Sequence, residues 1–212
     1  MLGLGPLQAG LWTVPSMLAY IAGSFAVPRI VRRVRPSYVM SVGMLVAAVG
    51  FGLLTQVGGP AGLAVIVAGS VIYSLGLSPV VILATDLIVG GAPVERAGAA
   101  SAISETSSEL GGALGIAILG SVGTAVYRLH LADAAPAGVP PEAAAAARAT
   151  LGGAAAVAGR LPDHVGAELL KMARQAFGQS FELTAGINAV LAIATAILTA
   201  ALLRGVRRAD EP

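Results

Sequence analysis

Two glutamates lie one helical turn apart within a long apolar segment. Glu105 and Glu109 are the only charged residues in residues 98–126, and a transmembrane helix needs about 20 apolar residues. A carboxylate in hydrocarbon costs at least ~2.5 kcal/mol on insertion scales, so it usually has a partner or a function. The chemistry that suits two such carboxylates is carriage of a proton or binding of a cation.

At 1.5 Å per residue, Glu105 is expected about 10 Å and Glu109 about 16 Å from the start of this segment, the latter near mid-membrane. No lysine or arginine lies at comparable depth in the apolar segments. Two interpretations of the pair remain open. In the first, both are structural acids, protonated or hydrogen-bonded by the hydroxyls of Ser104, Thr106, Ser107 and Ser108. In the second, they take up and release protons, or supply the counter-charge that a lipophilic cation lacks in lipid.

The composition is that of an integral membrane protein. Charged residues make up 11% of the chain, against about 25% in soluble domains, and the mean hydropathy is +0.84. The absence of cysteine excludes disulfides and thiolate metal sites. Only two histidines are present, His130 and His164, so we expect no metal site and no cofactor. The arginines cluster at the ends of apolar segments, where membrane topology places them, and we expect no nucleic-acid partner.

Five apolar segments are long enough to cross a bilayer, so the expected fold is an all-α integral membrane bundle. Residues 1–127 contain four transmembrane helices, at about 9–27, 38–55, 62–87 and 98–126. Residues 128–180 are expected to form an extracytoplasmic loop with two short helices, roughly 141–157 and 163–178, hinged near residues 159–162. Residues 181–212 contain the last transmembrane helix, about 181–203, and a basic tail.

The positive-inside rule predicts the orientation of these helices. If the N-terminus is outside and the C-terminus is cytoplasmic, all arginines of the short connections lie in the cytoplasm, and the opposite topology would place all of them outside. The arginines concerned are Arg29, Arg32, Arg33, Arg35, Arg96, Arg204, Arg207 and Arg208.

Three motifs resemble a known family. The string GxxPLQAG enters an apolar helix at residues 3–10, APVERAGAAS occupies residues 92–101, and SELGGALGIAILGS occupies residues 108–121. Together they resemble the C-terminal half of a major facilitator superfamily 14-helix drug:proton antiporter, with QacA-like quaternary-ammonium efflux pumps most similar. Those pumps also have a long outer segment between their last two helices. The resemblance implies a major facilitator fold in which these are helices ten to fourteen, with the N-terminal half of the transporter and helix nine missing.

The resemblance also implies a function and a set of site residues. The expected function is export of lipophilic, cationic drugs in exchange for protons, in a bacterial plasma membrane. In these pumps the positions of Glu105 and Glu109 are acidic as well, which implies proton coupling or cation binding. Those pumps have an aspartate where this chain has Tyr20. This difference argues against a preference for divalent cationic drugs. Trp12, Met17 and Tyr20 are candidate residues of the substrate cavity, and a cytoplasmic gating role is carried over only to Arg33.

Two further interpretations concern packing and class. Four glycines on the carboxylate helix are expected to form a small-residue face that permits close helix approach: Gly111, Gly115, Gly120 and Gly123. The alternative to a transporter bundle is a truncated, non-transporting membrane subunit that assembles with a separately encoded half. An enzyme is not expected, because no nucleophile–base pair, metal cluster or phosphate loop lies in or near the apolar segments.

Overall fold

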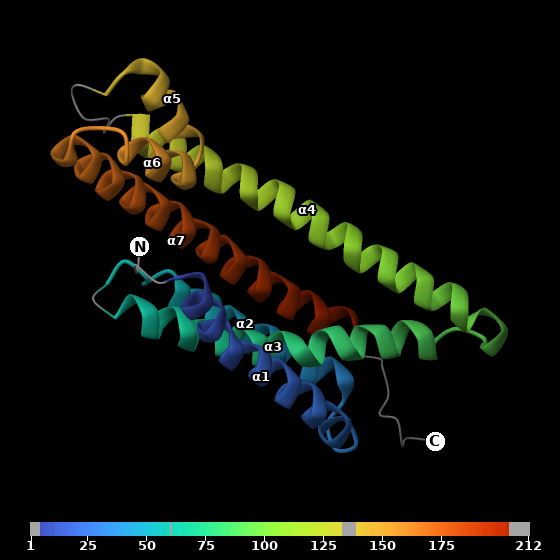
Figure 1. Ribbon diagram of the computed structural model, residues 1–212. Coiled ribbons are helices and arrows are strands. Elements are labelled where there is room, and N and C mark those ends of the chain that lie inside the picture. Colours follow the sequence, from blue (N-terminus) through green and yellow to red (C-terminus); the bar gives the residue numbers. More distant parts are fainter. Residues whose placement is uncertain (1–4, 60, 133–138, 204–212) are drawn as a thin grey trace. The chain divides into compact units, whose positions relative to one another are not determined.

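The computed structural model describes residues 5–59, 61–132 and 139–203 (Figure 1). Over these residues the protein is all-helical, without a β-strand. Five helices, α1 to α4 and α7, are long and apolar enough to cross a membrane. In chain order the elements are α1 (Pro6–Val31), α2 (Pro36–Leu54), α3 (Gly62–Gly90), the 3₁₀ helix η1 (Val94–Arg96), α4 (Ala97–Ala132), α5 (Pro141–Ala149), α6 (Leu151–Ala158) and α7 (Asp163–Leu202).

Some sequence features discussed above lie outside the described residues. These are Gly3, with which the first motif begins, and the tail arginines Arg204, Arg207 and Arg208.

Local sequence signals set several helix ends. Proline occupies the start of α1, α2 and α5, at Pro6, Pro36 and Pro141, where a backbone N–H would have no helical partner. At the other end of α3, the Gly91 N–H donates to the Leu87 carbonyl oxygen at 3.1 Å. These signals explain why the long helices begin and end close to the limits of the apolar segments.

The chain divides into two compact units. The hairpin unit is residues 113–184, and the bundle unit comprises the described residues within 2–112 and 185–212. Among the described residues, the hairpin unit has one buried apolar cluster and the bundle unit has two.

In the bundle unit, α2 packs closely against α3 through glycines. A Cβ on Gly43 would lie 2.6 Å from the Gly76 carbonyl oxygen, and one on Gly50 would lie 2.8 Å from the Gly69 carbonyl oxygen. The pairs ascend on α2 while they descend on α3, so the two helices are antiparallel. Small residues let helices approach this closely in membranes. The absence of side chains at these positions therefore fixes how α2 and α3 pack.

The bundle unit is completed by α1 and the C-terminal part of α7. On α1, the Cβ position of Gly23 is occupied by the side chain of Ser78, a fully buried α3 residue whose hydroxyl donates to the Leu75 carbonyl oxygen at 3.1 Å. On its other side, α2 buries Met44 and Ala48 together with alanines of α7, Ala192 and Ala196. Half of the most apolar part of α2 is buried, the largest share among the five long helices, so α2 is the central helix of this unit.

The hairpin unit is a small alanine-rich core with one buried polar contact. Its buried residues are Tyr127, Leu131, Ala147, Ala154, Leu169, Ala173 and Ala176. The Tyr127 hydroxyl donates to the Ala147 carbonyl oxygen at 2.9 Å, from α4 to the last turn of α5. That carbonyl is one of the helix-end groups without an intrahelical partner. The contact therefore satisfies two buried polar groups.

The segment expected as one helix over residues 141–157 is two helices in the structure. Thr150 is extended, with φ −155° and ψ 158°, and its hydroxyl accepts a hydrogen bond from the Gly153 N–H at 2.9 Å. This is an N-cap for α6, followed by two glycines, Gly152 and Gly153, that are poor helix formers. The cap at Thr150 therefore ends one helix and starts the next.

The segments expected as a short helix over 163–178 and a separate span from 181 form one continuous helix, α7, of 40 residues. No proline lies between Asp163 and Leu202. The helix continues through the Gly-Gln-Ser stretch at residues 178–180, where the Ser180 hydroxyl donates to the Phe177 carbonyl oxygen at 3.1 Å. The boundary expected at residues 180–181 is therefore not a break in secondary structure.

Candidate functional site

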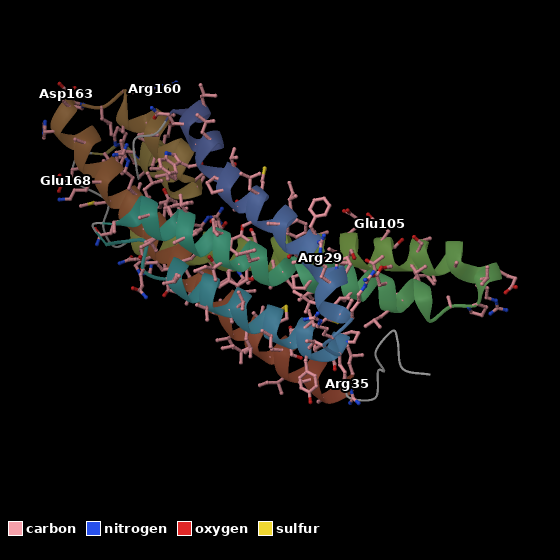
Figure 2. The ribbon with its side chains drawn as sticks, turned by 90° about the horizontal axis from the view of Figure 1, so that it is seen from below. Arg29, Arg35, Glu105, Arg160, Asp163 and Glu168 are labelled. Atoms are coloured by element: carbon pink, nitrogen blue, oxygen red, sulfur yellow. The ribbon has the colours of Figure 1, made fainter. Side chains whose placement is uncertain are left out.

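The carboxylates Glu105 and Glu109 lie on α4, and both side chains are exposed. Figure 2 shows Glu105 projecting away from the helix ribbon. Ser104, which directly precedes Glu105, is buried. This part of α4 therefore has a contact face, which contains Ser104, and an exposed face. Both glutamates lie outside the contact face.

The neighbouring hydroxyls do not bind these carboxylates. The Thr106 hydroxyl donates to the Ala102 carbonyl oxygen at 2.8 Å, and the Ser108 hydroxyl donates to the Ser104 carbonyl oxygen at 3.0 Å. Within the described part of the chain, neither Glu105 nor Glu109 has a hydrogen bond or an ion pair. The geometry therefore does not provide the hydroxyl partners on which the structural interpretation of the two acids relied.

Between Glu109 and Tyr127, α4 is largely an exposed apolar surface. Only 6% of its most apolar part is buried. In the described residues, a Cβ on Gly111, Gly115 or Gly120 would meet nothing within 4 Å, whereas one on Gly123 would lie 3.4 Å from Thr184 Cγ2. The expected small-residue face is thus packed at Gly123 alone. In the bundle unit, the glycines at close helix contacts include Gly23 of α1 and those of α2 and α3, since a glycine acts in packing only where a partner helix is present.

The candidate cavity residues Trp12, Met17 and Tyr20 are exposed on α1. At about 100° per residue, Tyr20 lies about 80° and Met17 about 140° around the helix from Trp12. The three side chains therefore do not share one narrow stripe. None of them lines the groove described next, and their role in a substrate cavity stays a prediction.

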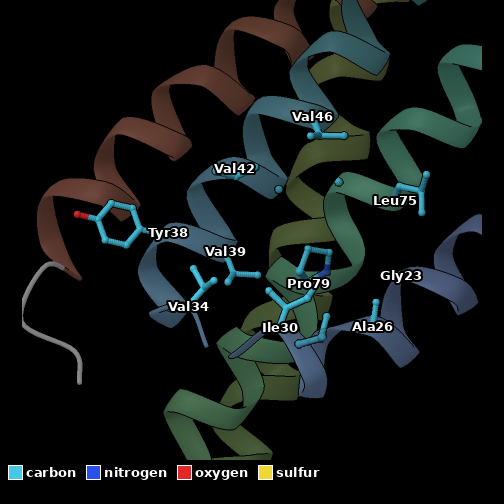
Figure 3. A pocket seen from close by; sticks show the side chains of 13 residues that line it. Gly23, Ala26, Ile30, Val34, Tyr38, Val39, Val42, Val46, Leu75 and Pro79 are labelled. Atoms are coloured by element: carbon cyan, nitrogen blue, oxygen red, sulfur yellow. The ribbon is translucent and has the colours of Figure 1, made fainter. Parts of the chain in front are cut away.

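A groove of about 400 Å³ lies between α1 and α2, with α3 as its floor (Figure 3). Sequence reasoning did not identify it. A signal was present, because Tyr38, Val42 and Val46 recur every fourth residue and form an apolar stripe. The other residues that line the groove are Gly23, Ala26, Val27, Ile30, Val34, Val39, Gly43, Leu75, Gly76 and Pro79.

The candidate gating residue Arg33 lies in the turn between α1 and α2 and is exposed. It immediately precedes Val34, which lines one end of the groove. The guanidinium of Arg29, one helical turn earlier (Figure 2), donates to the Phe25 carbonyl oxygen at 3.0 Å. The turn therefore presents positive charge beside an apolar groove, and a gating role for Arg33 stays a prediction.

The described residues contain no group of three or more His, Cys, Asp or Glu side chains that could hold a metal ion.

Comparison with characterised proteins identifies the class of the molecule. No family model matches the chain. The "Multidrug efflux pump LfrA" of Mycolicibacterium smegmatis is 39% identical over 203 residues, which cover 96% of this chain and 40% of that protein. The "Tetracenomycin C resistance and export protein" of Streptomyces glaucescens is 31% identical over 205 residues, covering 93% of this chain and 38% of that protein.

The chain is homologous to multidrug efflux pumps of the major facilitator superfamily. A third relative of this efflux-pump homologue is the "Methyl viologen resistance protein SmvA" of Salmonella typhimurium, 33% identical over 184 residues that cover 82% of the chain and 35% of that protein. The relatives are transporters and not enzymes. With five helices able to cross a membrane, the efflux-pump homologue is a multi-pass membrane protein. It spans between 35% and 40% of the length of these three relatives, so it corresponds to part of such a transporter.

Proposed function

We propose that the chain forms the C-terminal bundle of a proton-coupled drug exporter with a major facilitator fold. Joined to an N-terminal half, it exports lipophilic cationic drugs in exchange for protons by alternating access, with the substrate site between the two halves. The names of three relatives, a multidrug efflux pump, an export protein and a methyl viologen resistance protein, support this class of activity. The protein resides in a bacterial plasma membrane, with its N-terminus outside and its C-terminus in the cytoplasm.

The observation that carries this proposal is the exposure of Glu105 and Glu109 on an uncovered apolar helix. A carboxylate facing lipid is costly, and in this chain neither one has a protein partner among the described residues. Protonation removes the charge, and a lipophilic cation neutralises it. Alternation between these two states is the exchange of a proton for a cationic drug. In this proposal Glu105 is the exchanging carboxylate and Glu109 is its partner.

The remaining site residues complete the proposed pathway. Trp12, Met17 and Tyr20 line the substrate cavity once the other half is present, and the ring of Tyr20 offers a cation–π surface where related pumps have an acid. Arg33 belongs to the cytoplasmic gate.

The test is the substitution Glu105→Gln in a full-length transporter that contains this chain. We expect it to abolish efflux of a fluorescent cation driven by a pH gradient, because glutamine cannot exchange a proton. The matched control is Glu95→Gln, an exposed acid of η1 outside α4, which should leave the initial rate of efflux unchanged. Immunodetection in membranes shows whether each variant is present at the normal level. Normal efflux by Glu105→Gln would refute the assignment.

A second candidate function is a membrane subunit that assembles with a separately encoded half and does not transport by itself. The chain spans 40% and 38% of the length of two of its relatives, which are transporters. Efflux measured in cells that produce this chain alone, and in cells that also produce an N-terminal half, distinguishes the two. An assembly subunit without a transport role would leave efflux unchanged when it is added.

A further inference from the structure

The groove between α1 and α2 is open and apolar along its length. The side chains on its rim, Ile30, Val42 and Leu75, are exposed, and the Tyr38 hydroxyl is the only polar side-chain group among the lining residues. An exposed apolar surface of this kind suits contact with hydrocarbon and not with water. An apolar ligand can therefore enter it sideways from the bilayer.

The lining of the groove extends along the helices, which suits an extended acyl chain and not a ring system. On α2 its lining runs from Tyr38 to Val46, eight residues or about 12 Å along the helix axis. On α1 it runs from Gly23 to Ile30, or about 10 Å. Figure 3 shows these two rows of residues on either side of Leu75 and Pro79. Gly23, Gly43 and Gly76 also line the groove, and their lack of side chains lets α1 and α2 both pack closely on α3.

One end of the groove is positively charged. Val34 lines this end, and the exposed Arg32 and Arg33 precede it directly in the chain. No aspartate or glutamate occurs before Asp86. In the part of the chain that the structure describes, neither Arg32 nor Arg33 forms an ion pair with Asp86 or with Glu95. Within the described residues, Arg32 and Arg33 are therefore available to an anion from the surroundings.

We propose that this groove is a binding site for an anionic phospholipid. One acyl chain occupies the groove between Tyr38 and Val46, and the phosphate contacts Arg32 and Arg33. Arginine binds phosphate oxygens in a bidentate manner, and basic pockets at the ends of membrane helices suit anionic head groups. A single anionic phospholipid can fill the apolar groove with an acyl chain and bind the charged end with its phosphate. This site lies beyond the proposed function, because its ligand is a resident lipid and not a transported drug.

The test measures lipid retained by the full chain. The protein is reconstituted in vesicles of equal parts phosphatidylglycerol and phosphatidylcholine with identical acyl chains, extracted in a mild detergent, and its bound lipid is quantified by mass spectrometry. We expect several-fold more phosphatidylglycerol than phosphatidylcholine. Equal retention of the two lipids would overturn the assignment of the head-group site.

Two matched pairs of variants separate the acyl-chain site from the head-group site. Val42→Trp fills the groove and should lower retention of both lipids several-fold. The control Val49→Trp changes a valine of the same helix with similar exposure, 59% against 57%, that lies outside the groove. Arg32→Gln combined with Arg33→Gln should remove the preference for phosphatidylglycerol, whereas Arg96→Gln, an exposed arginine elsewhere, should preserve it. If Val42→Trp behaves like Val49→Trp, or the double arginine variant keeps the preference, the proposal is wrong.

Further experiments test whether a variant has misfolded and whether the groove binds a drug or a second copy of the chain instead of a lipid. If circular dichroism shows that Val42→Trp has lost helicity, Ile30→Trp across the groove replaces it, with Ile21→Trp of α1 as its control. Release of the phosphatidylglycerol by tetraphenylphosphonium would identify a drug site and overturn the lipid assignment, as would crosslinking of two chains through Val42→Cys. Because these measurements do not involve transport, they stand apart from the test of Glu105.

Discussion

The Cβ position of Gly43 on α2 lies 2.6 Å from the carbonyl oxygen of Gly76 on α3, so these two helices meet backbone to backbone. A side chain at position 43 can be accommodated only if α2 and α3 move apart. The same relationship recurs seven residues along each helix, at Gly50 and Gly69. The packing of the bundle unit therefore depends on glycine at defined positions.

Gly43→Ala should destabilise the protein by about 1–3 kcal/mol, the usual cost of overpacking. Gly52→Ala is the control on the same helix, because a Cβ there would meet nothing within 4 Å. It should be neutral or stabilising by about 0.5–1 kcal/mol, since alanine forms helix better than glycine. Reversible unfolding in detergent measures both free energies, and a destabilised Gly52→Ala with an unaffected Gly43→Ala would contradict the packing described.

Glu105 and Glu109 should behave as one unit in transport. In the full-length transporter, Glu105→Gln combined with Glu109→Gln is expected to lower the initial rate of cation efflux no further than Glu105→Gln alone. Residues that act together give non-additive losses, and the pair lies one helical turn apart on the exposed side of α4. If each single substitution lowers the efflux rate and the two factors multiply in the double variant, the carboxylates act independently.

Tyr127→Phe should weaken the hairpin unit by about 1–3 kcal/mol, because it leaves the buried Ala147 carbonyl oxygen without its donor. Hydrogen exchange of the α5 amides should accelerate in this variant. Tyr38→Phe removes a hydroxyl from an exposed tyrosine and should leave that exchange unchanged. Equal exchange in Tyr127→Phe and the unmodified protein would mean that the hydroxyl contributes nothing to the unit.

Thr150→Ala should cost about 1 kcal/mol, the typical effect of removing an N-cap side chain. Its effect should appear in the amide exchange of α6, where the Gly153 N–H loses its acceptor. Thr195→Ala is the matched control, because its exposed hydroxyl donates to a carbonyl within α7, at 2.8 Å from the Leu191 oxygen. If Thr195→Ala and Thr150→Ala accelerate the amide exchange of α6 to the same extent, the cap at Thr150 is not what separates α5 from α6.

Much of this protein follows from the sequence alone, because hydrophobicity is a property of each segment by itself. The low share of charged residues and five long apolar stretches predict a multi-pass helical membrane protein, and three motifs indicate its relationship to drug efflux pumps. The positions of Glu105 and Glu109 also follow directly, because a charge in an apolar segment is visible without knowledge of its surroundings.

Only the tertiary structure shows the features that depend on contacts between helices. Glycines occur on α2, α3 and α4 alike, yet only those with a facing helix, such as Gly43 and Gly76, act in close packing. The groove beside Tyr38 and Val42 exists because α1 and α2 both rest on α3 without filling the space between them. Packing couples residues far apart in the chain, and no local pattern encodes that coupling.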